Sequence, residues 1–178
     1  MYLMHEREPV LRRQRGLCLD PMKLTAFTDY SLRVLVYLAA EPERRATVAE
    51  IADAFGISDS HLTKVVHLLG KQGWIDTVRG KGGGLLLARS PQDIRIGKVV
   101  RDTEGAARPA ECFELDGGHC VISSCCRLKG VMAEAVKAFY AVLDGYTLAD
   151  LVHPRATLSR MLFIDRPRRP APARSATP

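Results

Sequence analysis

The chain has 178 residues, of which 47% are apolar, and its formal net charge is +6 at pH 7. This length fits one domain, or one domain with an appendage. No apolar run reaches the ~20 residues that a membrane-spanning helix requires, so no membrane segment is predicted. Most of the positive charge lies in residues 155–178, which contribute +5. The overall charge is therefore weak evidence for a nucleic-acid partner.

Residues 1–21 have no sustained helical or strand period, and they lack the apolar segment of a secretory signal. We expect this leader to be disordered or to be a gene-start artefact, with Met22 as the natural start. Without a secretory signal the protein is expected in the cytoplasm, where thiols stay reduced and disulfides are rare.

A strongly patterned segment follows the leader and predicts two helices. In the first helix, apolar residues recur at helical spacing between Thr25, which can cap it, and Pro42, which ends it. The second helix begins at Thr47-Val-Ala-Glu50, a capping box in which the hydroxyl and the carboxylate satisfy exposed backbone amides. Gly56 can adopt the left-handed conformation that commonly follows a helix.

A third helix is predicted from Ser58, its capping residue, to Gly73. Because only Gly56-Ile57-Ser58 separates it from the second helix, the pair is predicted to form a helix-turn-helix. Its outer face carries polar and basic groups of the kind that contact base edges and phosphates, although an ordinary solvated face has a similar composition. The candidate DNA-binding residues here are Ser58, Ser60, His61, Thr63, Lys64 and His67.

A β-hairpin is predicted directly after the third helix, with strands at Trp74–Arg79 and Leu85–Ala88. The loop Gly80–Gly84 between them is free to adopt positive φ. A hairpin in this position is a wing, and Arg79 and Lys81 at its tip suit phosphates or the minor groove. A nucleotide phosphate loop is the rival interpretation, but neither G-x-x-x-x-G-K-[ST] nor G-x-G-x-x-G is present.

A cysteine-rich loop, residues 106–126, follows the predicted DNA-binding domain of residues 22–105. A reducing compartment argues against disulfides, and the spacing gives no clean zinc-ligand pair of the Cys-x2-Cys kind. Cys112, Cys120 and Cys126 form Cys-x7-Cys-x5-Cys, which fits an iron–sulfur cluster best, because a cluster takes several thiolates from one loop. Four unrelated thiols are the alternative.

A long amphipathic helix is predicted after the cysteine loop. Its apolar residues step by 4, 3, 4 and 3 as in a coiled-coil seam, and this broad stripe favours pairing with a second copy. Residues 127–152 are therefore predicted to be a dimerisation helix with a C-terminal turn. The Pro- and Arg-rich residues 153–178 are predicted to be mostly disordered. The seam consists of Leu128, Met132, Ala135, Phe139 and Val142.

The pattern from Met22 to about Val152 resembles the dimeric winged-helix family of iron–sulfur transcription regulators. The resemblance implies a mainly α fold with a small β-hairpin wing, a winged helix-turn-helix plus a long dimerisation helix, and no enzymatic activity. Two of the shared motifs, Cys126–Lys129 and Tyr146–Val152, are similar to those of the family's nitric-oxide-sensing repressors in particular. The motifs are Leu24-Thr-x-Phe-Thr-Asp-Tyr30, Val78-Arg-Gly-Lys-x-Gly-Gly84, Ile94-Arg-Ile-Gly97, Cys126-Arg-Leu-Lys129 and Tyr146-Thr-Leu-Ala-Asp-Leu-Val152.

The resemblance also implies ligands for a [2Fe-2S] or [4Fe-4S] cluster. Cluster-biogenesis regulators of the family place a His three residues after the third cysteine, where this chain has Lys129. The nitric-oxide-sensing repressors instead imply three cysteines and an Asp from the first helix of the other subunit. His119 and Cys125 are alternative fourth ligands. The implied set is Cys112, Cys120, Cys126 and Asp29.

The resemblance therefore predicts a homodimeric repressor that binds a double-stranded DNA operator and releases it when nitric oxide reacts with the cluster. One alternative is a regulator of cluster biogenesis or oxidative stress, and another is a thiol- or zinc-dependent winged-helix regulator. A small iron–sulfur enzyme or electron carrier is the least favoured, because the chain lacks a nucleotide motif and paired catalytic carboxylates.

Overall fold

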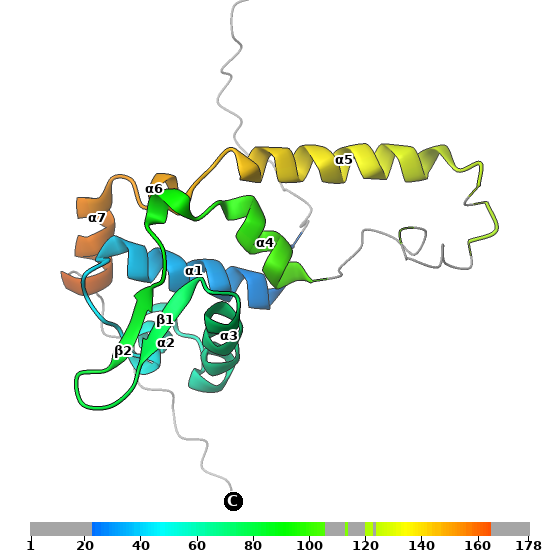
Figure 1. Ribbon diagram of the computed structural model, residues 1–178. Coiled ribbons are helices and arrows are strands. Elements are labelled where there is room, and N and C mark those ends of the chain that lie inside the picture. Colours follow the sequence, from blue (N-terminus) through cyan, green and yellow to red (C-terminus); the bar gives the residue numbers. More distant parts are fainter. Residues whose placement is uncertain (1–22, 106–112, 114–119, 123, 165–178) are drawn as a thin grey trace, which may run out of the picture.

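The computed structural model describes residues 23–105, 113, 120–122 and 124–164. In these ranges no helix is long and apolar enough to cross a membrane. Figure 1 shows most of the elements gathered around α1, with α5 extending away from them. The elements are α1 (Ala26–Ala40), α2 (Val48–Phe55), α3 (Asp59–Lys71), β1 (Ile75–Val78), β2 (Gly84–Leu87), the 3-10 turn η1 (Pro91–Asp93), α4 (Ile96–Glu104), α5 (Arg127–Asp144), α6 (Leu148–Leu151), α7 (Arg155–Ser159) and the π-helical turn η3 (Arg160–Ile164).

Helix α1 lies in the middle of the core. Its N-terminus is capped as predicted, because the Thr25 hydroxyl accepts a hydrogen bond from the Thr28 amide at 3.2 Å. The Thr25 amide in turn donates to the carboxylate of Glu104, at the end of α4, at 2.8 Å. Val34 and Leu35 on α1 are fully buried, and the helix contacts α3, α4 and α6. The apolar stripe of α1 therefore fixes the other helices relative to one another.

Helices α2 and α3 form the predicted helix-turn-helix. Both hydrogen bonds of the Thr47–Glu50 capping box are present, and Gly56 ends α2 in the left-handed conformation with φ 63°. Ser58 occupies the N-cap position of α3 as predicted, but among the described residues its side chain makes no capping hydrogen bond. Its hydroxyl instead lies 3.3 Å from that of Ser60. Helix α3 therefore begins without side-chain capping by Ser58.

Strands β1 and β2 form the predicted wing. They pair antiparallel from Ile75 opposite Leu87 to Val78 opposite Gly84, so the return strand begins one residue earlier than predicted. In the turn, a Cβ on Gly83 would lie 2.3 Å from the Val78 carbonyl oxygen, which is why only glycine fits there.

Helix α5 begins directly after Cys126, as predicted, and none of its described side chains is buried. Leu128 is 64% exposed and Val142 is 62% exposed. Phe139, from the middle of the predicted seam, packs against the core of its own chain. Among the described residues, α5 is therefore attached to the body of the protein by its C-terminal part, mainly through α4.

The C-terminal region departs from the prediction. Helix α6 begins with a capping box of Thr147 and Asp150, and the Ile96 amide donates to the Tyr146 carbonyl at 3.0 Å. Residues 153–178 were expected to be mostly disordered, but residues 155–164 form α7 and η3, so that prediction is wrong for them. The leader 1–21, most of the cysteine loop and residues 165–178 lie outside the described residues.

Candidate nucleic-acid interface and cysteine loop

The outer face of α3 carries the polar residues that the sequence predicted for DNA contact. The inner face is formed by Leu62, Val65 and Leu69, which are all at most 1% exposed. Burial of these three residues orients the rest of the helix toward solvent. The structure therefore brings together, on one exposed surface of the helix-turn-helix, the side chains of Ser58, Ser60, His61, Thr63, Lys64 and His67.

His61 is the member of this surface that touches another element. Its ring stacks on that of Tyr30 from α1, with ring centres 6.4 Å apart and an angle of 26° between the planes. A shallow pocket lies between the two helices and is lined by Ala26, Phe27, Tyr30, His61, Lys64 and Val65. The sequence placed Tyr30 in a family motif but did not predict its contact with His61 of α3. Its position beside Asp29 places the stack next to the candidate cluster ligand.

The wing presents the second predicted set of basic groups. Arg79 and Lys81 are both exposed at the tip. The backbone of the tip is bound by Arg45, whose Nη1 donates a hydrogen bond to the Gly82 carbonyl at 2.8 Å. Arg45 is a residue that sequence reasoning missed; the only signal was its place in the basic pair Arg44-Arg45, just before the capping box.

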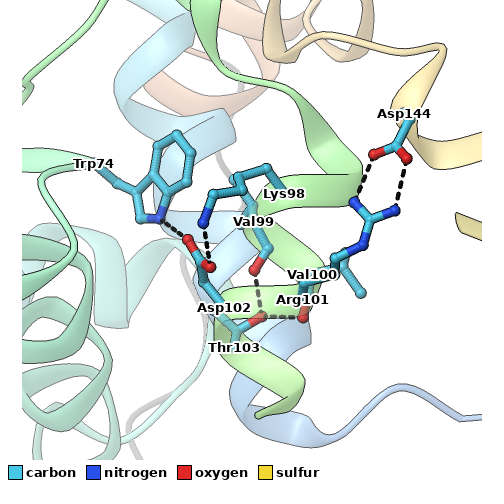
Figure 2. Close-up of polar contacts among 8 residues, drawn as sticks. All are labelled: Trp74, Lys98, Val99, Val100, Arg101, Asp102, Thr103 and Asp144. Atoms are coloured by element: carbon cyan, nitrogen blue, oxygen red, sulfur yellow. Dashed lines mark hydrogen bonds and ion pairs between the residues drawn. The ribbon is translucent and has the colours of Figure 1, made fainter.

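Helix α4 connects the wing to the rest of the domain (Figure 2). The indole N–H of Trp74, which directly precedes β1, donates to a carboxylate oxygen of Asp102 at 3.2 Å. The other oxygen of Asp102 accepts a hydrogen bond from Lys98 at 2.6 Å. The Asp102 side chain is only 14% exposed, so its hydrogen bond from Trp74 is largely shielded from water and holds the start of the wing against α4.

The opposite side of α4 holds α5. Both guanidinium nitrogens at the end of Arg101 bond to the two oxygens of Asp144, at 2.7 and 2.6 Å (Figure 2), and the guanidinium lies 4.4 Å from the Tyr140 ring centre. The hydrogen bonds from Arg101 lower the pKa of Asp144 below its ordinary value of 3.8. A Cβ on Gly97 would lie 2.0 Å from the Asp144 carboxylate, so the close approach requires glycine. We call this contact of Gly97, Arg101 and Asp144 the α4–α5 joint.

The three described cysteines, Cys120, Cys125 and Cys126, precede α5 at the end of the helix away from α4. Cys112 is outside the described residues; Cys120 and Cys126 are half-buried, and Cys125 is exposed. Cys126 is the N-cap residue of α5. The Cys125 thiol donates to the Ile122 carbonyl at 3.5 Å. Within the described residues no three His, Cys, Asp or Glu side chains are placed to hold a metal ion.

The fourth predicted ligand, Asp29, lies in the first turn of α1. Its carboxylate forms an ion pair with Arg33, with Oδ2 2.7 Å from Nη2 and Oδ1 3.1 Å from Nε. Helix α5 has 18 residues and is therefore roughly 27 Å long at a rise of about 1.5 Å per residue, with its N-terminus at the end away from α4. The structure of one chain does not bring Asp29 together with Cys120 and Cys126.

Comparison with known proteins identifies the family. Residues 24–154 match Rrf2, described as "Iron-dependent Transcriptional regulator". The HTH-type transcriptional regulator NsrR of Bacillus subtilis is 49% identical over 142 residues, which cover 79% of this chain and 97% of that protein. NsrR of Geobacillus kaustophilus is similar to the same extent.

Solved structures agree with the fold. IscR of T. potens has a TM-score of 0.61 and 29% identity, over 75% of this chain and 88% of that one. Oxidized CymR of Staphylococcus aureus has a TM-score of 0.59 and 26% identity, over 74% of this chain and 97% of that one. The predicted fold, a mainly α winged helix-turn-helix with a hairpin wing, is thereby confirmed, and the enzyme alternative is excluded. The chain belongs to the Rrf2 family of iron-dependent, DNA-binding transcriptional regulators.

Proposed function

We propose that this regulator is a cytoplasmic, homodimeric repressor that releases its operator in response to nitric oxide, which it senses through an iron–sulfur cluster. The observation that carries the proposal is the position of Cys126 at the start of α5, a helix whose contacts with the DNA-binding domain, in the part of the chain that the structure describes, lie toward its other end. A change in the chemical state of the cysteines can therefore alter the relative orientation of the two DNA-binding domains of the dimer, because α5 transmits it as a rigid helix. The similarity to NsrR supports nitric oxide as the effector, together with the motifs at Cys126–Lys129 and Tyr146–Val152 that resemble the family's nitric-oxide-sensing repressors.

The operator contacts divide between two elements. In this proposal α3 enters the major groove, where Ser60, His61 and Lys64 contact base edges. Arg79 and Lys81 of the wing contact phosphates or the minor groove. The exposure of all five residues supports this assignment. A dimer would present two copies of α3, and so would bind a double-stranded operator with two half-sites.

The second subunit covers the exposed apolar face of α5. Leu128, Val131 and Val142 are each at least 60% exposed in the single chain, which is unusual for large apolar residues that lie along one helix. Pairing of α5 with its copy removes this surface from water. In such a dimer the free end of α5 extends past its own body, so its cysteines can approach α1 of the other subunit.

The donor set fits an iron–sulfur cluster, [2Fe-2S] or [4Fe-4S]. Cys112, Cys120 and Cys126 would supply three thiolates, and Asp29 of the second subunit the fourth ligand. The helix N-terminus at Cys126 and the cations of Arg127 and Lys129 favour the negative charge that such a site carries. When bound, the cluster supplies iron that reacts with nitric oxide.

Asp29 would exchange between two partners. Its carboxylate, held by Arg33 in the single chain, must turn toward the cysteine loop of the other subunit in the operator-binding form. Loss of that contact returns Asp29 to Arg33. The neighbouring Tyr30 stacks on His61 of α3, so the exchange acts close to the base-reading face.

A thiol-dependent regulator is the second candidate. The exposed thiol of Cys125 favours it, as does the 26–29% identity to CymR, described for B. subtilis as the global cysteine regulator. An absorption spectrum of protein purified without oxygen, with iron and sulfide analysis, separates the two. The proposal expects iron–sulfide absorption that disappears in Cys112→Ser, Cys120→Ser and Cys126→Ser but persists in Cys125→Ser. A colourless protein would contradict it.

A further inference from the structure

The segment formed by α7 and η3 lies beyond the part of the chain that matches the family, which ends at residue 154. Yet Leu158, Leu162 and Phe163 of this segment pack against the core. The contacts of residues 155–164 show which part of the domain they act on. We call this segment the C-terminal clamp.

The clamp first supplies hydrogen-bond donors to the C-terminal end of α1. Arg155 donates from Nε to the Ala40 carbonyl at 2.8 Å, and Ser159 donates to the Glu41 carboxylate at 2.7 Å. The last carbonyls of a helix have no partners within it, and they carry the negative end of its dipole. Since the last turn of α1 contains no basic residue, a guanidinium from 115 residues further along the chain supplies the missing donor and charge.

The clamp next holds the connection between α1 and α2. The Phe163 ring meets Tyr37 edge to face with ring centres 4.9 Å apart, and the Arg44 guanidinium lies 4.9 Å from its centre. Arg44 also pairs with the Glu50 carboxylate at 2.5 Å. Tyr37 is only 2% exposed. Phe163 therefore fixes Arg44 between the clamp and α2.

The residues that follow Arg44 support the wing. Arg45 donates to the Gly82 carbonyl at 2.8 Å. Ala46 exchanges two hydrogen bonds with Leu85 of β2, at 3.2 and 2.8 Å, and so acts as a third strand of one residue. An isolated two-stranded hairpin is marginally stable, so its position depends on such contacts. Residues 40–46 thus touch the clamp on one side and the wing on the other.

We propose that the C-terminal clamp positions the wing for DNA, with Phe163 as the positioning residue and Arg44 to Ala46 as the link. This proposal rests on the proposed contact of the wing with DNA. The clamp lowers the freedom of the wing in the unbound protein, so less order has to be gained on binding. Without the clamp the same basic residues remain, but they are less well placed.

The test measures operator affinity of the full-length dimer by fluorescence anisotropy. Phe163→Ala should weaken binding roughly three- to ten-fold, and Lys81→Ala should lose part of its effect in that background, because the two residues act through one element. A hydroxyl-radical footprint of Phe163→Ala should lose the protection by the wing and keep that by α3. Met161→Ala is the matched control: Met161 is 63% exposed on the same segment, and its loss should leave the affinity unchanged.

The results distinguish two roles of Phe163, positioning the wing and merely stabilising the domain. Additive effects of Phe163→Ala and Lys81→Ala, or a footprint weakened evenly, would show that Phe163 only stabilises the domain. The proposal that the clamp positions the wing would then be wrong, while the proposed function would stand. If Lys81→Ala and Arg79→Ala leave binding unchanged, the wing does not contact DNA and both proposals fall. Phe163→Leu keeps apolar volume and loses the ring contacts, so it replaces Phe163→Ala if that variant does not fold, with the same expected coupling.

Discussion

Single residues decide how α5 meets the DNA-binding domain. At the α4–α5 joint, Gly97 lets the backbone of α5 approach closely, and Arg101 holds Asp144 by two hydrogen bonds. The sequence shows the family motif that contains Gly97, but it does not show why the motif needs a glycine there. Only the structure shows that the glycine faces a residue more than forty positions away, at the end of another helix.

Gly97→Ala should disrupt this joint. The new Cβ would lie 2.0 Å from the Asp144 carboxylate and 3.0 Å from its backbone nitrogen, so the carboxylate must leave its bonds to Arg101 and the end of α5 must move slightly. We expect a loss of about 1–3 kcal/mol in the free energy of unfolding, as for other overpacked sites, together with weaker operator binding. Denaturant unfolding measures the first and an operator titration the second. Gly130→Ala is the control, because nothing lies within 4 Å of its Cβ position in α5; it should be neutral or stabilising.

The same joint should be sensitive to acid. Hydrogen bonds from Arg101 lower the folded-state pKa of Asp144 below the ordinary 3.8. The ion pair therefore contributes its full stability above pH 3.8 and loses it as the pH falls through the lowered folded-state value. The free energy of unfolding should fall more steeply below this pH in the unchanged protein than in Asp144→Asn. Equal slopes for the two proteins would show that the pair does not contribute.

At the scale of elements, local signals predicted well and distant contacts did not. The Thr47–Glu50 box and Gly56 fixed the bounds of α2 because each signal acts within a few residues. Residues 155–164 were missed because their helical turns depend on contacts such as Phe163 with Tyr37, over a hundred positions away. Phe139 was assigned to the seam from its spacing, which cannot distinguish a partner's surface from the chain's own core.

Helix α5 should be the dimer interface, and its free half gives a clean test. Leu128→Glu with Val131→Glu places charges where both residues are at least 60% exposed in the single chain, so the monomer should stay folded. In a paired helix these carboxylates would be buried without partners, at a cost of several kcal/mol. Sedimentation equilibrium should show a folded monomer, whereas Lys137→Glu should remain dimeric. A dimer in both cases would place the interface elsewhere.

Helix α3 and the wing should contribute differently to DNA binding. Arg79→Ala should weaken binding on all sequences and reduce its salt dependence, because a phosphate contact carries no sequence information. Ser60→Ala or His61→Ala should instead change the base preference. Competition titrations against an operator series at two salt concentrations measure both effects. Equal and sequence-independent losses from all three changes would contradict this division.

At the scale of the whole molecule, α4 is the element that the other parts share. It contacts the start of the wing through Trp74, α5 through Asp144 and the N-cap of α1 through Thr25. The cysteine loop begins where α4 ends and ends where α5 begins. In the proposed function, a change in that loop would act on both of the helices that it joins, and through them on the orientation of α3 and the wing.

In the proposed function, the state of the cysteine site sets operator affinity. An operator titration of cluster-loaded protein, with and without nitric oxide, and of cluster-free protein tests this directly. We expect tight binding only for the loaded, untreated protein, with a loss of about 5- to 150-fold in the other two, the range typical of coupled sites. Equal affinity in all three states would show that the cysteine site does not control DNA binding, even with the fold and the DNA-binding surface intact.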